Sequence, residues 1–235
     1  MIEFQAPPIE LVTSHSPMTR AYMVAATYIF KHGEIGLTKS GAWNRRFIEW
    51  AVTHIDFPGW TGEELYRVNK VLNEYDVAPL EYLHALMDGL KWGRKYQGTY
   101  RLTKTGKGLG QSPDAAFLAV IPAFLFRFDH AESMQTKAPL GNWDIFLNII
   151  NHEIGDGITA ARLAGILYGD DSLGWNSPAS VLSAAVFRPL CWAGLLQSEE
   201  GHGLSKRVYH KTPLWDAALQ LDPIQGADNV VSFRR

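Results

Sequence analysis

Apolar residues recur every three or four positions along most of the chain, which is the spacing of one buried face of an α-helix. Such runs predict helices over 19–30, 43–55, 61–75, 79–90, 143–154, 159–167, 177–190 and 213–219. Residues 115–128 are apolar on every side. Because a bilayer span needs about 20 residues, this run predicts a buried core helix and no membrane span.

Local signals place several helix ends. Thr61 stands three residues before Glu64, the spacing of a capping box. Ser177 precedes Pro178, which suits an N-cap followed by proline in the first turn. Gly33 is expected to stop the first helix, and Pro189 to bend or end a later one. Thr38 or Ser40 is expected to cap the helix over 43–55.

Two segments read as strand–turn–strand. Residues 92–103 alternate around Gln97 and Gly98, a pair that suits a tight hairpin turn. Residues 195–212 follow the same pattern, with Gly201 and Gly203 in the turn. Short helix, helix and hairpin therefore occur in the same order twice, which predicts a degenerate tandem repeat. The fold class is expected to be mainly α with small β-hairpins, in two units packed together.

The units have expected boundaries. Pro7, Pro8 and Pro17 mark an extended arm, and the proline, glycine and small polar residues near Pro139 mark a linker. An apolar stretch at 229–233 is expected to form an edge strand. The division is an N-terminal arm (1–18), a first unit with the apolar helix (19–130), a linker (131–142), a second unit (143–222) and a C-terminal tail (223–235).

One phrase occurs twice, 65 residues apart. Leu37-Thr38-Lys39-Ser40-Gly41 and Leu102-Thr103-Lys104-Thr105-Gly106 are near-copies. The phrase is similar to one found where a strand meets a helix in winged helix–turn–helix proteins. The stretch 35–109 also resembles uncharacterised bacterial proteins with the phrase at both ends. The resemblance implies a leucine pointing inward, a threonine capping the helix, and two winged-helix-like units. Because winged helices bind DNA or proteins, it implies no single activity.

Charge is nearly balanced overall, with 22 Lys and Arg against 24 Asp and Glu, so a polycationic protein is excluded. Residues 89–113 nevertheless hold six cations and no acid, the segregation that phosphate contact requires. The candidate DNA-binding residues are Arg45, Arg46, Arg94, Lys95, Arg101, Lys104 and Lys107. We therefore expect a DNA-binding protein of regulatory type with a basic wing.

The helix over 79–90 gives a different indication. Its outward positions are expected to be Glu81, Tyr82, His84, Ala85 and Asp88, which lack the Arg or Asn that reads guanine or adenine. The second unit is poorer still in base-reading side chains and is expected to serve packing or dimerisation. The alternative is therefore a protein–protein interaction or assembly module on a winged-helix scaffold without DNA binding.

No constellation of residues indicates an enzyme, a cofactor or a metal site. His152-Glu153 begins a zinc motif but lacks its second histidine, and the glycines of 106–110 complete neither a dinucleotide nor a phosphate loop. Cys191 is the single cysteine and is expected to be a buried, inert thiol. The N-terminus has no signal-like pattern, so a cytoplasmic protein without membrane contact is expected.

Overall fold

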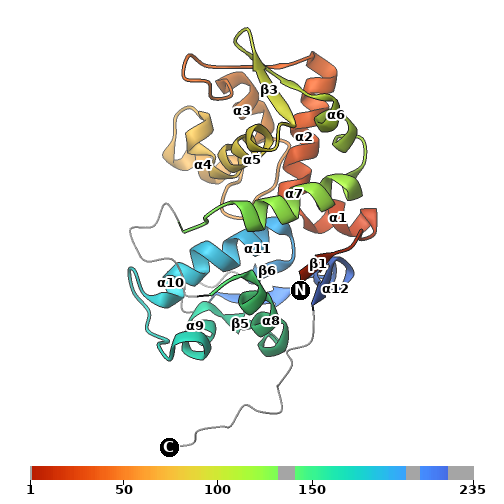
Figure 1. Ribbon diagram of the computed structural model, residues 1–235. Helices are drawn as coiled ribbons and strands as arrows, with labels where there is room; N and C mark the ends of the chain where they lie inside the picture. The colour runs from red at the N-terminus through yellow and green to blue at the C-terminus, as the bar shows by residue number, and fades with distance from the viewer. Residues whose placement is uncertain (1, 132–140, 200–206, 222–235) are drawn as a thin grey trace, which may run out of the picture.

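The chain folds into two mainly helical domains with small antiparallel sheets, which confirms the expected fold class of α with β-hairpins. A computed structural model describes residues 2–131, 141–199 and 207–221 (Figure 1). The expected linker therefore lies mostly outside the described residues. So do the tail at 223–235 with its expected strand, and the turn glycines Gly201 and Gly203. No helix of the described ranges is both long and apolar enough to cross a bilayer.

The first domain, in the upper half of Figure 1, ends in a long apolar helix. Its three strands form one sheet in the order β2-β4-β3. Its elements are α2 (Pro17–His32), β2 (Ile35–Gly36), α3 (Arg45–Ala51), α4 (Gly62–Val68), a 3₁₀ turn η1 (Glu74–Asp76), α5 (Ala78–Gly89), β3 (Gly93–Tyr96), β4 (Thr99–Leu102), α6 (Lys104–Leu109) and α7 (Pro113–Arg127).

Apart from α4, which has no counterpart, the second domain repeats the order helix, strand, helix, helix and hairpin, and its sheet order β5-β7-β6 matches β2-β4-β3 of the first. Its third helix runs without interruption through α10, η2 and α11. Its elements are α8 (Trp143–Glu153), β5 (Ile158–Thr159), α9 (Ala160–Tyr168), α10 (Pro178–Leu182), a π-helical turn η2 (Ser183–Phe187), α11 (Arg188–Ala193), β6 (Leu196–Glu199), β7 (Val208–Lys211) and α12 (Pro213–Ala218).

Hydrogen bonds fix which positions of the two domains are equivalent. After the helix that precedes each hairpin, α5 or α11, the Lys91 N–H donates to the Asp88 carbonyl at 3.1 Å, and the Gly194 N–H donates to the Cys191 carbonyl at 3.0 Å. Lys91 therefore corresponds to Gly194, and Asp88 to Cys191. Both residues that follow the helix have positive φ, 56° at Lys91 and 86° at Gly194.

The hairpins extend this correspondence. Lys95 pairs with Tyr100 across the first hairpin, and Ser198 pairs with Tyr209 across the second. Each of Lys95 and Ser198 lies four residues beyond the equivalent positive-φ position. Asp88 and Lys95 of the first domain thus stand where the second domain has Cys191 and Ser198.

Most capping signals are confirmed. Thr61 and Glu64 form a capping box at α4, Ser177 caps α10 with Pro178 in its first turn, and Gly33 ends α2. The expected cap of α3 is wrong, because Asn44 accepts a hydrogen bond from the Phe47 N–H and the helix begins at Arg45.

The two Leu-Thr-Lys-x-Gly phrases have different structures. Thr103 caps α6 directly, and Leu102 is buried before it. The side chain of Thr38 instead accepts from the Ala42 N–H at 3.1 Å inside a turn. A short sequence phrase therefore does not determine where the next helix starts.

The expected extended arm at 1–18 is wrong. β1 (Ile2–Phe4) pairs antiparallel with β8 (Leu219–Leu221), and α1 (Ile9–His15) follows it. Phe4 packs against Phe117 with ring centroids 6.3 Å apart. A three-residue strand whose partner is more than 200 residues away gives no periodic pattern in the sequence. The neighbouring prolines favoured an extended segment over the 7-residue helix that forms there.

The apolar helix α7 lies in the interior, as expected. Seven of its side chains are buried, and it packs against α2 of the first domain and α11 of the second. Trp192 of α11 meets Phe124 of α7 at 6.2 Å and Phe57 of the first domain at 5.6 Å. One continuous hydrophobic core therefore joins the two domains.

The π-helical turn has a local cause. Pro189 follows η2, has no N–H to donate, and its ring is incompatible with the carbonyl four residues earlier. The helix accommodates the proline by a wider turn over Ser183–Phe187 rather than by ending. The expected bend at Pro189 is thus realised as a π turn.

Candidate nucleic-acid interface

The first hairpin has one core face and one cationic face. Tyr100 and Leu102 point into the core and are buried. Arg94 and Arg101 are directly opposite each other on the other face. The turn residues Gln97 and Gly98 both have positive φ, at 47° and 75°, as a tight hairpin turn requires. The hairpin expected from the sequence is therefore confirmed, and it lies at the end of the molecule away from the second domain (Figure 1).

Two neighbours hold the opposed arginines together. Tyr96 lies under both, with its ring centroid 4.9 Å from Arg101 Cζ and 5.9 Å from Arg94 Cζ. Glu34 accepts hydrogen bonds from Arg101 Nε at 2.8 Å and Nη2 at 2.5 Å. Like charges across a strand pair repel, and the Glu34 carboxylate and the Tyr96 ring offset that repulsion.

Two further cations lie on the helix after the hairpin. Lys104 and Lys107 are exposed on α6, which packs against β4. Within the described residues, no ion pair forms on Arg94, Lys104 or Lys107, so their charges remain available to an anionic partner. Four of the seven candidate residues, including Arg101, thus occur on the outer face of the hairpin and the helix after it.

The remaining three candidates are placed differently. Lys95 is on the inner side of the hairpin, where its Nζ lies 3.2 Å from Asp88 Oδ2. Arg45 and Arg46 are exposed in the first turn of α3, a separate helix. We therefore define the basic wing as Arg94, Arg101, Lys104 and Lys107, with Tyr96 between the arginines.

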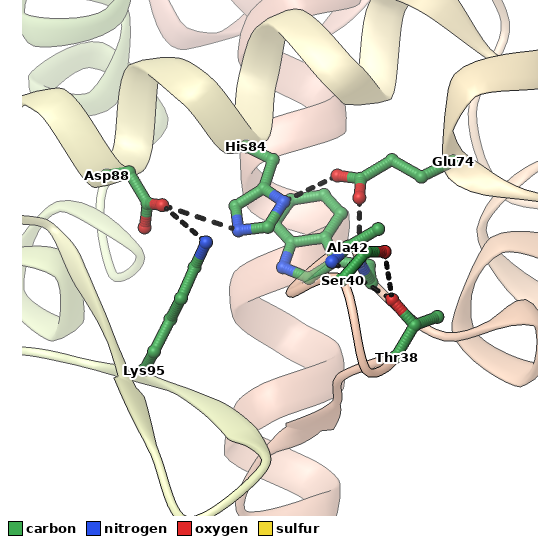
Figure 2. A network of polar contacts seen from close by, with 8 residues as sticks. Thr38, Ser40, Ala42, Glu74, His84, Asp88 and Lys95 are labelled. Atoms are coloured by element: carbon green, nitrogen blue, oxygen red, sulfur yellow. Dashed lines mark hydrogen bonds and ion pairs between the residues drawn. The ribbon is translucent and has the colours of Figure 1, made fainter.

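A polar network with a buried centre lies beneath the hairpin (Figure 2). The ion pair between Lys95 and Asp88 continues to His84, whose Nε2 is 3.7 Å from Asp88 Oδ2. His84 Nδ1 is 2.6 Å from Glu74 Oε1, and the Trp43 backbone N–H donates to Glu74 Oε2 at 2.7 Å. The network connects β3, α5, η1 and the segment that leads into α3.

The centre of this network is enclosed by aromatic rings. His84 and Glu74 are only 6% and 5% exposed. The Trp43 indole stacks on the His84 ring at 4.5 Å and 10°, and Tyr100 contacts the ring edge-on at 4.8 Å. A buried carboxylate is costly unless it is paired and hydrogen-bonded, and His84 and the Trp43 N–H satisfy Glu74.

Close packing leaves little freedom at the hairpin. A Cβ on Gly93 would lie 2.2 Å from the ring of Tyr100, so only glycine fits there. Burial also raises the pKa of Tyr100 strongly, and the Asp88 carboxylate adds to the shift, so this hydroxyl stays protonated. The orientation of the wing is therefore set by the network and by the contact of Tyr100 with Gly93.

Two side chains of α5 that were expected to point outward are covered in the structure. His84 was expected to point outward and is buried, because it turns toward Trp43 and Tyr100. Tyr82 is partly buried and packs on Trp192 of the second domain at 5.8 Å. The helix is covered on two sides, which periodicity within a single helix does not reveal. Glu81 and Ala85 are exposed as expected.

The thiol expected to be inert, Cys191, is partly buried in α11. Burial raises its pKa to about 12, so the thiol is protonated at neutral pH. Within the described ranges, no group of three or more His, Cys, Asp and Glu side chains is placed to hold a metal ion.

Comparisons with known proteins agree with the division into two domains. Residues 14–115 match the model of the Y4jL N-terminal domain, and residues 133–213 match that of the y4jL C-terminal domain. The uncharacterized protein y4jL of Sinorhizobium fredii is 35% identical over 165 residues, which cover 68% of this chain and 74% of that protein. No solved structure matches the chain.

Proposed function

The chain belongs to the y4jL family, and from the geometry of its first domain we propose that it binds double-stranded DNA through phosphate contacts. The observation that carries this proposal is the outer face of the first hairpin. Arg94 and Arg101 share that face with Tyr96, and Lys104 and Lys107 are exposed on α6, the helix that follows β4. Such a patch releases counterions when it neutralises phosphates, which supplies most of non-specific DNA affinity.

The topology supports the same proposal. Helix, strand, helix, helix and hairpin, with the first strand hydrogen-bonded to the last, is the arrangement of a winged helix, and the first domain has it with α4 as an additional helix between α3 and α5. In that reading α3 and α5 form the helix–turn–helix and β3 and β4 form the wing. The rigid support beneath the hairpin would present the arginines in a fixed orientation, so that little side-chain and loop entropy is lost on binding.

Base reading has weaker support than phosphate contact. The exposed side chains of α5 include Glu81 and Ala85, and neither is a donor to guanine or a bidentate partner of adenine. We therefore propose binding with little sequence preference through the basic wing, with any regulatory role dependent on other contacts. The acidic exposed position Glu81 is the observation that favours the alternative, a protein-interaction module without DNA binding.

The test is fluorescence anisotropy of a labelled mixed-sequence duplex with the full chain. We expect binding that weakens by at least tenfold between about 50 and 200 mM salt, and that is lost in Arg94→Glu/Lys104→Glu. Arg162→Glu in the second domain is the matched control, since Arg162 is also exposed, and it should bind as the wild type does. No binding by the wild type at low salt would overturn the proposal and favour the protein-interaction alternative.

A further inference from the structure

A cavity of about 460 Å³ opens between the third helix and the hairpin of the second domain, and residues 58–64 of the first domain close it. Its wall includes Cys191 and Ser198, which are equivalent to the ion-paired Asp88 and Lys95 of the first domain. Two charged side chains in one domain are thus replaced by two small neutral ones in the other. The volume is in the range of small-molecule sites in proteins.

The wall is rich in hydrogen-bond donors. Arg188 and Arg207 both line it. Ser183 and Tyr209, which are buried, share a single hydrogen bond of 3.0 Å between their hydroxyls. Whichever hydroxyl donates, the hydrogen of the other remains available for an acceptor. Burial raises the pKa of Tyr209, so its hydroxyl is protonated at neutral pH.

Free acceptors are scarce by comparison. The carboxylate in the wall, Glu64, accepts from the Thr61 N–H at 2.9 Å and from the Thr61 hydroxyl at 2.7 Å, both through Oε2, as the capping box of α4. Its Oε1 is left as an acceptor, so the wall sets one carboxylate against the two guanidinium groups of Arg188 and Arg207. The Ser180 hydroxyl donates to the Ser177 carbonyl. An occupant with acceptor oxygens and negative charge therefore suits the wall better than a cation or a donor-rich molecule.

Aromatic side chains set the shape of the occupant. Trp60 comes from the first domain and Trp192 from the second, with ring centroids 6.4 Å apart and nearly perpendicular planes. Arg188 lies over the Trp192 ring at 5.5 Å, which holds its guanidinium against the cavity wall. The π-helical turn begins at Ser183, and such turns are frequent at functional sites.

We propose that this cavity binds a small planar aromatic carboxylate, with the ring against Trp60 and the carboxylate bound by Arg188 and the Ser183–Tyr209 hydroxyl pair. The ligand would take the space that the Asp88–Lys95 ion pair occupies in the first domain. It would also contact both domains, because residues 58–64 form one wall. The inference does not depend on DNA binding, since the cavity lies apart from the basic wing.

The test is isothermal titration calorimetry of the full chain with 2-naphthoate, indole-3-carboxylate and 4-hydroxybenzoate, and with 2-naphthamide as the uncharged match of the first. We expect saturable binding of at least one carboxylate, and at least tenfold weaker binding of 2-naphthamide than of 2-naphthoate. Absence of saturable binding by all three acids at millimolar concentration would overturn the proposal, as would equal affinity for the acid and the amide.

Two variants locate the site. Arg188→Met keeps most of the apolar stem over Trp192 and removes the charge, so it should weaken carboxylate binding at least about tenfold. Arg162→Met removes a cation elsewhere in the same domain and should leave binding unchanged. If Arg188→Met unfolds, Ser183→Ala serves in its place, with a smaller expected loss. Unchanged binding in the folded variant would place the ligand elsewhere and overturn the assignment.

Discussion

Apart from α4, the two domains have the same order of elements, but they use the hairpin and the helix before it differently. In the first domain Lys91, two residues after the end of α5, is exposed to solvent with φ of 56°. At the equivalent position of the second domain, Gly194 is buried and pressed against the chain between α1 and α2. One position thus faces water in one domain and forms part of the domain junction in the other.

The helices before these positions also differ in burial: the helix of the first domain is more exposed than that of the second. α5 leaves Glu81 and Ala85 exposed, whereas α10, η2 and α11 are buried over most of their length, with Trp192 inserted among Phe57, Tyr82 and Phe124. The second domain uses this helix mainly for packing, and its partly exposed side chains Ser180, Ala184 and Arg188 line the cavity. Equivalent topology therefore does not imply equivalent function, and the first hairpin is the better candidate for DNA contact.

The largest expected effect comes from Gly194→Ala. A Cβ there would lie 2.0 Å from the backbone carbonyl oxygen of His15, and φ is 86°. We expect a loss of about 4 kcal/mol in the free energy of unfolding, from backbone strain and overpacking together. Gly33→Ala is the control, because φ is also 86° but nothing lies within 4 Å. Urea unfolding should show a loss of only about 1 kcal/mol there. Equal losses would contradict a tight junction at Gly194.

His84→Phe makes the first domain resemble the second, since His84 is equivalent to Phe187, four residues before Cys191. The change removes one partner of a buried pair, and the Glu74 carboxylate keeps only the Trp43 N–H. We expect a loss of about 3 kcal/mol in chemical denaturation. Adding Glu74→Gln should restore part of it, because the uncompensated charge is removed. Additive losses would show that Glu74 and His84 do not stabilise each other.

Acid should weaken the core between the domains through His130. Desolvation lowers the pKa of this histidine to about 4, with the nearby Arg188 charge acting in the same direction, while its hydrogen bond to the Phe124 carbonyl and Asp129 oppose the shift. The unfolded chain binds the proton near pH 6.5, so stability is full above that pH and falls as the pH drops toward 4.

Denaturation at about pH 7 and pH 5 measures this contribution. The wild type should lose about 2 kcal/mol more than His130→Gln over that interval. Tyr82 stacks on His130 at 5.8 Å, so the loss should appear as weaker packing near Trp192. The same pH dependence in both proteins would mean that other groups are responsible.

The smallest effect is expected at Lys91. Its positive φ is unfavourable for a residue with a Cβ, and glycine relieves this strain at the cost of a more flexible unfolded chain. Lys91→Gly should therefore raise the free energy of unfolding by about 0.5 kcal/mol. Thermal unfolding under matched conditions measures the change. A destabilised variant would show that the Lys91 side chain makes contacts that stabilise the domain.

Local features were predictable from the sequence because their causes are local. The turn at Gln97-Gly98, the Thr61–Glu64 capping box and the burial of α7 each depend on residues close together in the chain. The pairing of β1 with β8 depends on segments at opposite ends of it. These strands are too short to give a periodic pattern, so the sequence did not predict their pairing.

The candidate site was predictable in part for the same reason. The pairing of the first hairpin alone predicts that Arg94 and Arg101 lie opposite each other on its outer face. The ion pair of Lys95 could not be predicted, because its partner Asp88 lies on another element. The burial of His84 could not be predicted either, because it depends on contacts with Glu74 and the Trp43 ring. The spacing of ten residues between Glu74 and His84 crosses a helix boundary and matches no helical or strand repeat. Charge density therefore indicated the surface, whereas the ion pairs of Lys95 with Asp88 and of Arg101 with Glu34 join residues of different elements and had no local sequence signal.

The claim that only the first hairpin contacts DNA has a direct test in one pair of substitutions. Arg94 and Gln197 occupy equivalent strand positions, each one residue after the first paired residue of its hairpin. Anisotropy titrations across a salt series give the slope of log affinity against log salt for the wild type, Arg94→Gln and Gln197→Arg. We predict that Arg94→Gln lowers the slope by about 0.9 and that Gln197→Arg leaves it unchanged. An unchanged slope for Arg94→Gln, or a steeper one for Gln197→Arg, would contradict this assignment of the two hairpins.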